Sequence, residues 1–513
     1  MSQIVTPDIR ATRIGQQVLD DGGGAVDAVI AASAALCVVY PHNVSLGGDT
    51  WTLVDPPDAD PIAVNGTGRA PAALSADLLT GQGLEAMPGS GPHSITIPGL
   101  VGAWGELHRR WGSIPLEELI EPARRLADDG AAVAPALARD LGSWAHELAR
   151  DPGCAAVFLD AEGAAPGQGD LLVQPALART LERLGEQGVT ALYGGEVGRA
   201  YVEGLRRAGS VITVDDLADH RTELTEPLVT GYRGYDVLTS PPSSQGFTLL
   251  EILSLLEELG VDDPLRSEQV PMIAAAVMRA AADRDRISAD PDFVSVDVEG
   301  LLDHGAIAER ADAIRAARTA PANGPWPPLG GDTIGMVAVD GNGCSVSSVQ
   351  SVAGTFGSRV LEPSTGILAH NRGGGFSLDP EKPGYLVGGR RPPHTLMPCL
   401  VRRGGRTIGA LASMGGHSQP FILTQILSRI LAGDDPQQAV AAPRWVVGTS
   451  GEGPRLLADD RITERVLTEL SAAAPTVRIP MNDNRLGHGH ALWSTPDGWT
   501  HGTDPRADGA GTG

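Results

Sequence analysis

Residues 318–339 read RTAPANGPWPPLGGDTIGMVAV, and this stretch decides how the fold is interpreted. Its first fifteen residues, 318–332, hold four prolines and three glycines, a composition that forms no regular helix or strand. The run from Thr333 to Val339 is mostly apolar, which predicts a strand that begins at Thr333. Asp-Gly-Asn-Gly at 340–343 is a strong turn signal, and it joins this strand to a second one at 344–352. The sequence therefore predicts an exposed linker that leads directly into the edge of a sheet.

The Asp332-Thr333 junction, placed between a flexible linker and a predicted strand, has the features that an intramolecular peptide cleavage needs. The threonine hydroxyl can attack the preceding carbonyl carbon, an acyl shift gives an ester, and hydrolysis of that ester frees the amine of Thr333. An α-amino group has a pKa of about 7.7 to 8.0, so near neutral pH it can take the hydroxyl proton. Thr333 would then supply both the nucleophile and its base. A threonine that opens a strand after a Gly-rich loop is, however, commonly structural, and spacing alone favours that interpretation.

Helical patterns dominate the chain upstream of the linker. Apolar residues recur at helical spacing over 11–40, and an Asp-Gly-Gly-Gly run divides them into a helical hairpin. Strand-like runs at 51–54 and 62–64 flank a Pro-rich loop, and the region 98–317 is mostly helical by pattern. Downstream, the composition stays β-like until a predicted helix at 420–432.

The composition limits the partners that the protein can bind. The chain has 513 residues, 42% apolar and 20% charged, which is typical of a globular protein with a large core. Its formal net charge of -24 repels phosphate backbones and anionic lipid, so we expect neither nucleic acid nor a membrane as a partner. Four scattered cysteines show neither metal-ligand spacing nor a disulfide framework. No export signal is visible at the start, and we expect a cytoplasmic protein.

An ordered series of short segments connects this chain to a known family. The segments are GGGAVDAVIAASAALCVVYPH, SLGGDTW, SITIPGLVGAWGELHRRWG, GYRGYDVLTSPPSSQG, ADRDRISADPDFV, GGDTIGMVAVD, GTFGS, STGILAHN, FSLDP, SMGG, APRW and GTDPRADGAG. From residue 11 to its end the chain thus resembles the gamma-glutamyltransferase family of N-terminal-nucleophile hydrolases. The resemblance implies an α/β fold, an αββα sandwich with two antiparallel sheets between helical layers.

The resemblance also assigns roles to residues. Thr333 would be the nucleophile, and cleavage after Asp332 would give residues 1–332, ending in the linker 318–332, and residues 333–513. These two subunits would form a heterodimer that shares one composite domain; whether heterodimers pair further is open. Ser351 would hydrogen-bond the nucleophile, and the backbone amides of Gly415 and Gly416 would form the oxyanion hole. No cofactor is implied, and the partners would be a small-molecule amide and water or an amine acceptor.

Departures from the family pattern concern the substrate. Relatives that act on glutamate carry an acidic residue where this chain reads Arg372-Gly-Gly-Gly-Phe, and a serine pair where it has His394-Thr395. Ala353 likewise replaces an expected asparagine. NGTGRAP, NRGGGFSLDP, PPHTLMP and SMGGHSQP instead resemble the subgroup that contains oxamate amidohydrolase. With Arg69 and Arg372 available, the pocket would favour a short carboxylate, because guanidinium groups pair bidentately with carboxylates.

Each proposed substrate-binding residue also has a structural interpretation. Arg69 either clamps substrate or pairs with a surface carboxylate, and His394 either touches substrate or holds its loop by a hydrogen bond. Arg372 falls where the family contacts its ligand, which favours a binding role. The loop 378–391 is short, so we expect no long lid and an open site.

Other polar motifs are assigned structural roles. His488 and His490 alternate on a predicted strand without a cysteine or carboxylate cluster, so no metal is assigned. Asp504 and Arg506 are expected to form a turn-stabilising ion pair, and residues 283–286 (DRDR) a charge network on a helix surface.

The leading hypothesis is a self-cleaving amidohydrolase that acts on a small carboxylate-bearing amide through an acyl-enzyme at Thr333. Hydrolysis or transfer from gamma-glutamyl donors such as glutathione is the second, and it requires a free α-amino group on the donor. An acylase for a larger amide is the third, favoured by an open site. A non-enzymatic alternative, an uncleaved scaffold protein, is opposed by the intact junction, Ser351 and the glycine pair.

Overall fold

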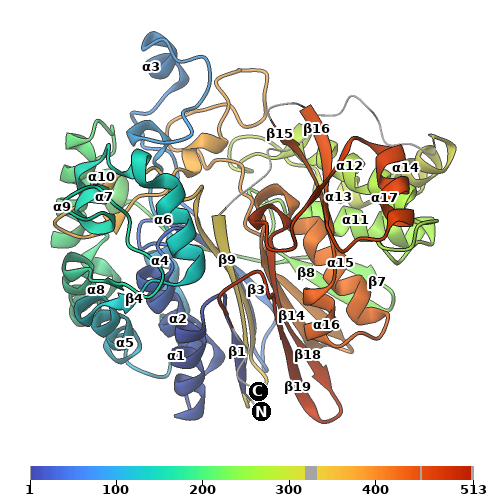
Figure 1. The fold of residues 1–513 in the computed structure, drawn as a ribbon, viewed down its shortest axis with the longest axis horizontal. Helices are drawn as coiled ribbons and strands as arrows, with labels where there is room; N and C mark the ends of the chain where they lie inside the picture. The colour runs from blue at the N-terminus through green and yellow to red at the C-terminus, as the bar shows by residue number, and fades with distance from the viewer. Residues whose placement is uncertain (1, 318–331, 451–452, 510–513) are drawn as a thin grey trace.

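The computed structural model describes residues 2–317, 332–450 and 453–509, so the predicted linker, apart from Asp332, lies outside the described residues. Two antiparallel six-stranded sheets stand face to face in the centre, with helices outside each of them (Figure 1). The first sheet has the order β1 (Gln3–Val5), β9 (Asp332–Val339), β10 (Ser345–Ala353), β2 (Asp49–Asp55), β3 (Ile62–Gly66), β6 (Glu223–Thr225). The second has the order β19 (Gly498–Thr503), β18 (His488–Thr495), β14 (Arg406–Met414), β13 (Cys399–Arg403), β8 (Tyr235–Thr239), β7 (Leu228–Tyr232). This arrangement confirms the predicted αββα sandwich.

Helices of the first half of the chain cover the outer face of the first sheet. They are α1 (Ile9–Asp20), α2 (Ala25–Val39), α4 (Leu100–Trp111), α5 (Leu116–Asp129), α6 (Pro135–Leu148), α7 (Pro152–Phe158), α8 (Pro175–Gln187), α9 (Glu196–Arg207) and α10 (Val214–Ala218). Short pieces lie around them: α3 (Ala76–Gly81), β4 (Ala131–Ala132), β5 (Leu171–Leu172), β11 (Leu361–Glu362) and β12 (Ile367–Leu368).

The second sheet is covered by α11 (Gly246–Leu259), α12 (Val270–Ile287), α13 (Val298–Leu302), α14 (His304–Ala317), α15 (Gln419–Leu431), α16 (Pro436–Ala441) and α17 (Glu464–Ala473). A small sheet of β15 (Trp445–Ser450), β16 (Gly453–Asp459) and β17 (Thr476–Ile479) lies beside them. Five 3-10 turns complete the described elements: Pro92–Ser94, Gly188–Ala191, Arg372–Gly375, Gly416–Ser418 and Asn484–Leu486.

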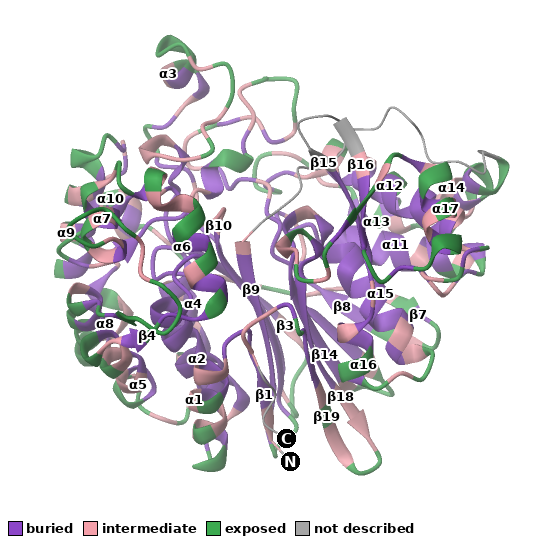
Figure 2. Cartoon of the chain, viewed as in Figure 1, coloured by how far each residue is buried: buried purple, intermediate pink, exposed green. Residues whose placement is uncertain are grey.

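The predicted helical hairpin is confirmed as α1 and α2. Asp8 caps α1 by accepting a hydrogen bond from the amide of Arg10, and α2 is buried along its whole length because it packs between the first sheet and the outer helices. Its many alanines permit that close packing on every side. Figure 2 shows α2 and the central strands as buried and the exposed residues on the outer helices.

The two strands predicted after the linker are confirmed as β9 and β10. Asp340 forms the turn between them: its Oδ1 accepts from the amides of Asn342 and Cys344, and its Oδ2 accepts from the amide of Ala25. Gly335 brings β9 against the other sheet, since a Cβ there would lie 2.8 Å from the Ala412 Cβ and from the Ser413 amide. The strand that begins at Asp332 and Thr333 is therefore tied to both sheets.

The region 98–317 is mostly helical, as predicted, but short strands interrupt it. Residues 223–239 form β6, β7 and β8 instead. The side chains of β7 alternate between half-buried and exposed, which is the pattern of a half-buried sheet strand, and Arg233-Gly234 supplies the turn into β8 with positive φ at both residues.

Residues 283–286 were predicted to form a charge network on a helix surface, and this surface position is wrong for two of them. Asp283 and Arg284 are buried. Asp283 accepts hydrogen bonds from Arg279 and Arg286, while Arg284 donates to the His417 carbonyl at 3.3 Å. The charged residues of this segment do not by themselves reveal that other parts of the chain pack over helix α12.

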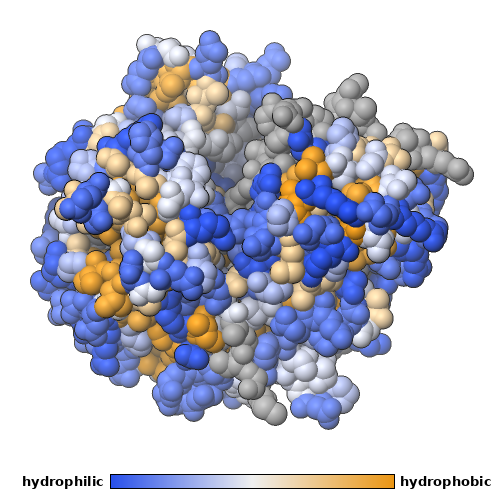
Figure 3. Space-filling view, in the orientation of Figure 1, coloured by the Kyte–Doolittle hydropathy of each residue, from blue (hydrophilic) through white to orange (hydrophobic). Residues whose placement is uncertain are grey.

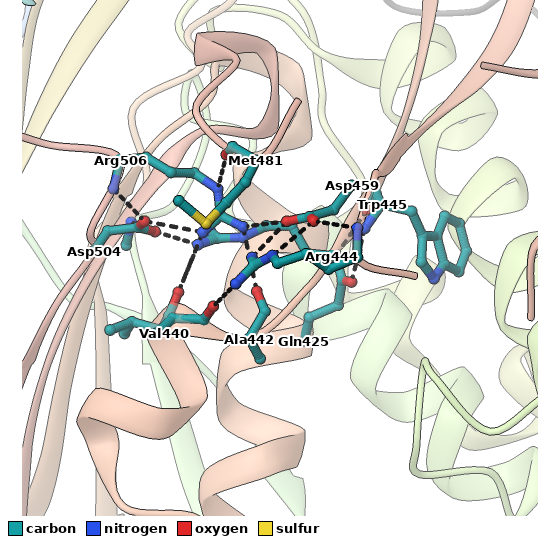
Figure 4. A network of polar contacts seen from close by, with 12 residues as sticks. Gln425, Val440, Ala442, Arg444, Trp445, Asp459, Met481, Asp504 and Arg506 are labelled. Atoms are coloured by element: carbon teal, nitrogen blue, oxygen red, sulfur yellow. Dashed lines mark hydrogen bonds and ion pairs between the residues drawn. The ribbon is translucent and has the colours of Figure 1, made fainter. Parts of the chain in front are cut away.

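The ion pair predicted near the C-terminus is confirmed and is part of a larger cluster. We call Arg444, Asp459, Asp504 and Arg506 the C-terminal ion network (Figure 4). Arg506 lies 2.6 Å from Asp459 and 3.0 Å from Asp504, and Arg444 also pairs with Asp504. All four side chains are buried, so this network ties the small sheet to β18 and α16.

Surface features agree with a globular chain. Most of the face in Figure 3 is hydrophilic, with small separate apolar groups. All four cysteines are free and buried. In the part of the chain that the structure describes, no helix is long and apolar enough to cross a bilayer.

Candidate active site

Thr333 lies buried at the start of β9, opposite an irregularity in β10. The β9–β10 register shifts between Gln350 and Ala353, and this bulge holds Ser351 beside Thr333. The Thr333 hydroxyl donates to Ser351 Oγ at 3.2 Å, and the Ser351 hydroxyl donates to the Asp332 carbonyl at 2.5 Å. Ser351 Oγ also accepts from the Ala353 amide at 2.7 Å. The Ser351 hydroxyl thus contacts both the Thr333 hydroxyl and the Asp332 carbonyl, the two groups that a self-cleavage would join.

The neighbouring groups hold this junction in place. The Asn43 side chain donates to the Thr333 carbonyl at 3.3 Å, and the Thr355 hydroxyl donates to the Asp332 carboxylate. Burial raises the pKa of the Asp332 carboxyl to about 6, although the Thr355 hydrogen bond opposes that shift. No role for Asn43 or Thr355 is predicted from the sequence, although Asn43 directly follows the family segment ending in YPH and Thr355 lies within GTFGS.

The glycine pair follows β14 directly. Gly415 has φ 146° and Gly416 has φ 53°, backbone conformations that favour glycine. The Gln245 side chain donates to the Gly416 carbonyl and to the Thr395 carbonyl, both at 2.8 Å. The oxyanion role of the Gly415 and Gly416 amides stays a prediction. Such amides stabilise negative charge only when they point at the position of the substrate oxygen.

Arg372 and Thr395 are brought together. Arg372 is buried and donates to Thr395 Oγ1 at 3.1 Å, and among the described residues no carboxylate lies within 4.0 Å of its guanidinium. Burial lowers the pKa of Arg372 to about 10, although Asp49 opposes the shift. In the part of the chain that the structure describes, this buried guanidinium therefore has no ion-pair partner, an arrangement that would suit the binding of an anion.

Asp49 and His370, which no sequence pattern marked, lie with the predicted residue His394 beside Arg372. Asp49, fully buried, lies 3.1 Å from His394 Nε2 and 3.2 Å from His370 Nδ1. Burial opposes ionisation of Asp49, but the two imidazoles, His370 foremost, hold its pKa well below the usual range. Burial, together with Arg372, lowers the pKa of His394 to about 3. We call Asp49, His370, Arg372 and His394 the histidine cluster.

Arg69 pairs with three carboxylates instead of being free. Its guanidinium lies 2.6 Å from Asp292, 3.2 Å from Glu223 and 3.3 Å from Asp290. This is the second of the two interpretations that the sequence left open for Arg69. A substrate contact of Arg69 remains a prediction.

A cavity of about 340 Å³ lies beside the histidine cluster. Its lining includes Gln245, Arg284, His394, His417 and Lys382, and the short loop after Phe376 borders it. Lys382 is exposed and is the only lysine in the 513-residue sequence. The cavity therefore joins the buried cluster to the surface.

His488 and His490 lie buried on β18. Among the described residues, no three His, Cys, Asp or Glu side chains come together as a metal site.

The sequence of this chain matches a known protein family. The model of the gamma-glutamyltranspeptidase family matches residues 11–513. The chain belongs to this family. Relatives include the glutathione hydrolase-like YwrD proenzyme of Bacillus subtilis, 36% identical over 99% of this chain and 98% of that protein. The oxamate amidohydrolase proenzyme of Klebsiella pneumoniae is 35% identical, also over 99% of this chain and 98% of that protein.

A solved structure of a gamma-glutamyltranspeptidase-like fold matches the whole chain. Cephalosporin acylase from Bacillus halodurans superposes with a TM-score of 0.92 at 30% identity, covering 100% of this chain and 95% of the other. Together with the family match, this confirms the family resemblance, the N-terminal-nucleophile hydrolase fold and the enzyme class, an amidohydrolase of the gamma-glutamyltranspeptidase type.

Proposed function

We propose that the protein cleaves its own chain between Asp332 and Thr333 and then hydrolyses a small amide that carries a carboxylate. The observation that carries the proposal is the hydrogen-bond chain from the Thr333 hydroxyl through Ser351 to the Asp332 carbonyl. Attack of Thr333 Oγ on that carbonyl carbon, departure of the Thr333 nitrogen and hydrolysis of the ester leave a free threonine amine. The proenzyme names of both relatives support this step.

The same groups then serve an external substrate. The free amine takes the hydroxyl proton, Thr333 Oγ attacks the substrate carbonyl, and the amides of Gly415 and Gly416 receive the developing negative charge. The substrate amine leaves with that proton, and water hydrolyses the remaining ester. Arg372 would bind a substrate carboxylate, because it is buried, has no ion-pair partner among the residues that the structure describes, and guanidinium groups pair strongly with carboxylates. Oxamate is the simplest amide of this class.

An acylase for a larger amide is the second candidate function. The cavity of about 340 Å³ beside His394 favours it, since oxamate fills only a small part of such a volume. The similarity to a cephalosporin acylase points the same way. Gamma-glutamyl donors remain a third candidate, supported by the glutathione hydrolase-like relative, although Arg372 stands where a free α-amino group would require an acid.

The first experiment compares the intact mass of the purified wild type with that of Thr333→Ala. We expect two wild-type fragments that meet at residue 333 and one uncut chain in the variant. A screen of oxamate, glutathione and a glutaryl amide then separates the three substrate classes. A wild-type chain that stays uncut and inactive would overturn the proposal.

A further inference from the structure

Gln245 is buried directly before α11 and connects two loops that border the cavity beside the histidine cluster. Its side-chain nitrogen Nε2 donates to the Thr395 carbonyl and to the Gly416 carbonyl, both at 2.8 Å. A carbonyl only accepts, so these two contacts use both protons of the carboxamide and fix which end of the side chain is the nitrogen. The oxygen Oε1 then faces Arg284 Nη1 at 3.5 Å. The Gln245 carboxamide is therefore held in a single orientation.

The turn at Gly415 and Gly416 has little conformational preference of its own, because glycine has no Cβ to restrict its backbone. Within the turn, the Gly415 carbonyl accepts from the Ser418 amide at 2.9 Å, and the Gly416 carbonyl accepts from the Gln419 amide. Gln245 donates to the Gly416 carbonyl from outside the turn. Each peptide group is planar, so a contact that fixes a carbonyl also restricts the neighbouring amides. The Gln245 side chain thus helps to set where the amides of the turn point.

Arg284 holds the next carbonyl of the same loop. It is buried on α12, where it donates to Asp285 at 2.8 Å and to the His417 carbonyl at 3.3 Å. Two side chains from residues 1–332 therefore contact two successive carbonyls from residues 333–513. In the cut protein that we propose, these contacts would join one subunit to the other.

The Thr395 segment has backbone hydrogen bonds that do not involve the Gln245 side chain. The His394 amide donates to the Ser243 carbonyl at 2.8 Å, and the His394 carbonyl accepts from the Gln245 amide at 2.9 Å. These bonds persist when only the side chain of Gln245 is changed. Loss of that side chain should therefore move the glycine turn more than the segment that contacts Arg372.

We propose that Gln245 is a positioning residue, whose side chain holds the turn at Gly415 and Gly416 in the conformation that receives the oxygen of the substrate carbonyl. This rests on the proposed function, which takes the amides of that turn as the oxyanion hole. Because Gln245 acts through the turn, its loss lowers kcat and leaves KM nearly unchanged. Self-cleavage persists without it, because the carbonyl attacked in that step accepts from Ser351.

The kinetic test replaces Gln245 by methionine, which has a similar length and no proton to donate. For Gln245→Met we expect complete self-cleavage, a kcat for oxamate about tenfold lower and a KM within about twofold of the wild type. Gln425→Met is the matched control, because Gln425 is also buried and donates to a backbone carbonyl, that of Trp445 in β15 at 2.9 Å. Equal losses of kcat in the two variants, or a change confined to KM, would overturn the proposal.

A measurement without substrate separates this proposal from the proposed function. Crystal structures of Thr333→Ala and of Thr333→Ala/Gln245→Met compare the turn directly, and we expect the peptide groups at Gly415 and Gly416 to rotate in the second protein. A turn with the same φ and ψ in both would overturn the positioning role even if oxamate is a substrate. A wild type that leaves oxamate intact, with a turn that moves on loss of Gln245, removes the substrate class and keeps the positioning role. The kinetic comparison then uses the amide that the screen identifies.

Discussion

Two buried clusters of charged side chains differ in how their charges are balanced. In the C-terminal ion network each carboxylate has at least one guanidinium partner, and Arg461 meets Asp459 from the partly exposed side at 2.6 Å. In the histidine cluster Arg372 donates to the Thr395 hydroxyl at 3.1 Å and has no ion-pair partner among the described residues. The comparison teaches that burial of charge has two uses in this molecule. The saturated network holds elements together, whereas the histidine cluster leaves a guanidinium that could pair with the carboxylate of the proposed substrate.

The largest expected effect is on stability, in the saturated network. Arg506→Met leaves Asp459 and Asp504 buried with fewer partners, and we expect the free energy of unfolding to fall by about 3 to 5 kcal/mol. Urea unfolding of the two proteins measures it. Arg461→Met is the matched control, with an expected loss below about 1 kcal/mol because that side chain is partly exposed. Equal losses in the two variants would contradict the distinction.

Arg372→Gln is expected to act on binding and to leave stability intact. Loss of a charge-assisted contact should raise the KM for oxamate by roughly 30- to 100-fold. The folded pKa of Arg372 is lowered to about 10, so the charged form is disfavoured by folding, and a neutral side chain should not lower the free energy of unfolding. Kinetics and urea unfolding of the same preparation check both parts. A destabilised variant with unchanged KM would show that Arg372 is structural.

The stability of the uncut chain is expected to depend on pH through Asp332, a buried carboxyl that, unlike those of the C-terminal ion network, has a raised pKa. The pKa of Asp332 is raised to about 6 in the fold, against about 3.9 in an unfolded chain. Its contribution to stability is therefore present below about pH 4 and is lost as the pH rises towards 6. We expect Thr333→Ala to lose more stability over this range than Thr333→Ala/Asp332→Asn. Parallel stability curves for the two proteins would contradict this assignment.

Lys382 should give the smallest effect. Lys382→Ala removes an exposed charge at the cavity mouth, and we expect a two- to fivefold higher KM for amides with a carboxylate on a long arm, but no change for oxamate. Lys382→Arg keeps the charge and serves as the control. A matching change for neutral amides would indicate a packing role.

Prediction from sequence succeeded where local signals were strong. The strand at Thr333 and the hairpin of α1 and α2 were marked by turn and cap residues and by periodic apolar residues. The strands β7 and β8 were missed because each has only five residues and they lie in a region whose other elements are mostly helices.

Prediction of the candidate site from the sequence reached only residues that are close together in the chain or that the family resemblance identifies. Ser351 lies opposite Thr333 as expected, and Arg372 meets Thr395. Asp49 and His394 are separated by 345 positions, and nothing in a linear pattern joins them. Only the closure of β2 against the segment before β13 brings that pair together.

The arrangement of the two sheets determines whether the protein can refold after it has been unfolded. β9 lies between β1 and β10, and strands from both sides of residue 332 form each six-stranded sheet. Cutting the chain therefore leaves the two fragments interleaved, and they separate only by unfolding. Before the cut, refolding is a first-order event; afterwards it requires two molecules to meet. The mature protein should then tolerate storage but recover from denaturation with a yield that depends on protein concentration, whereas the Thr333→Ala chain should not.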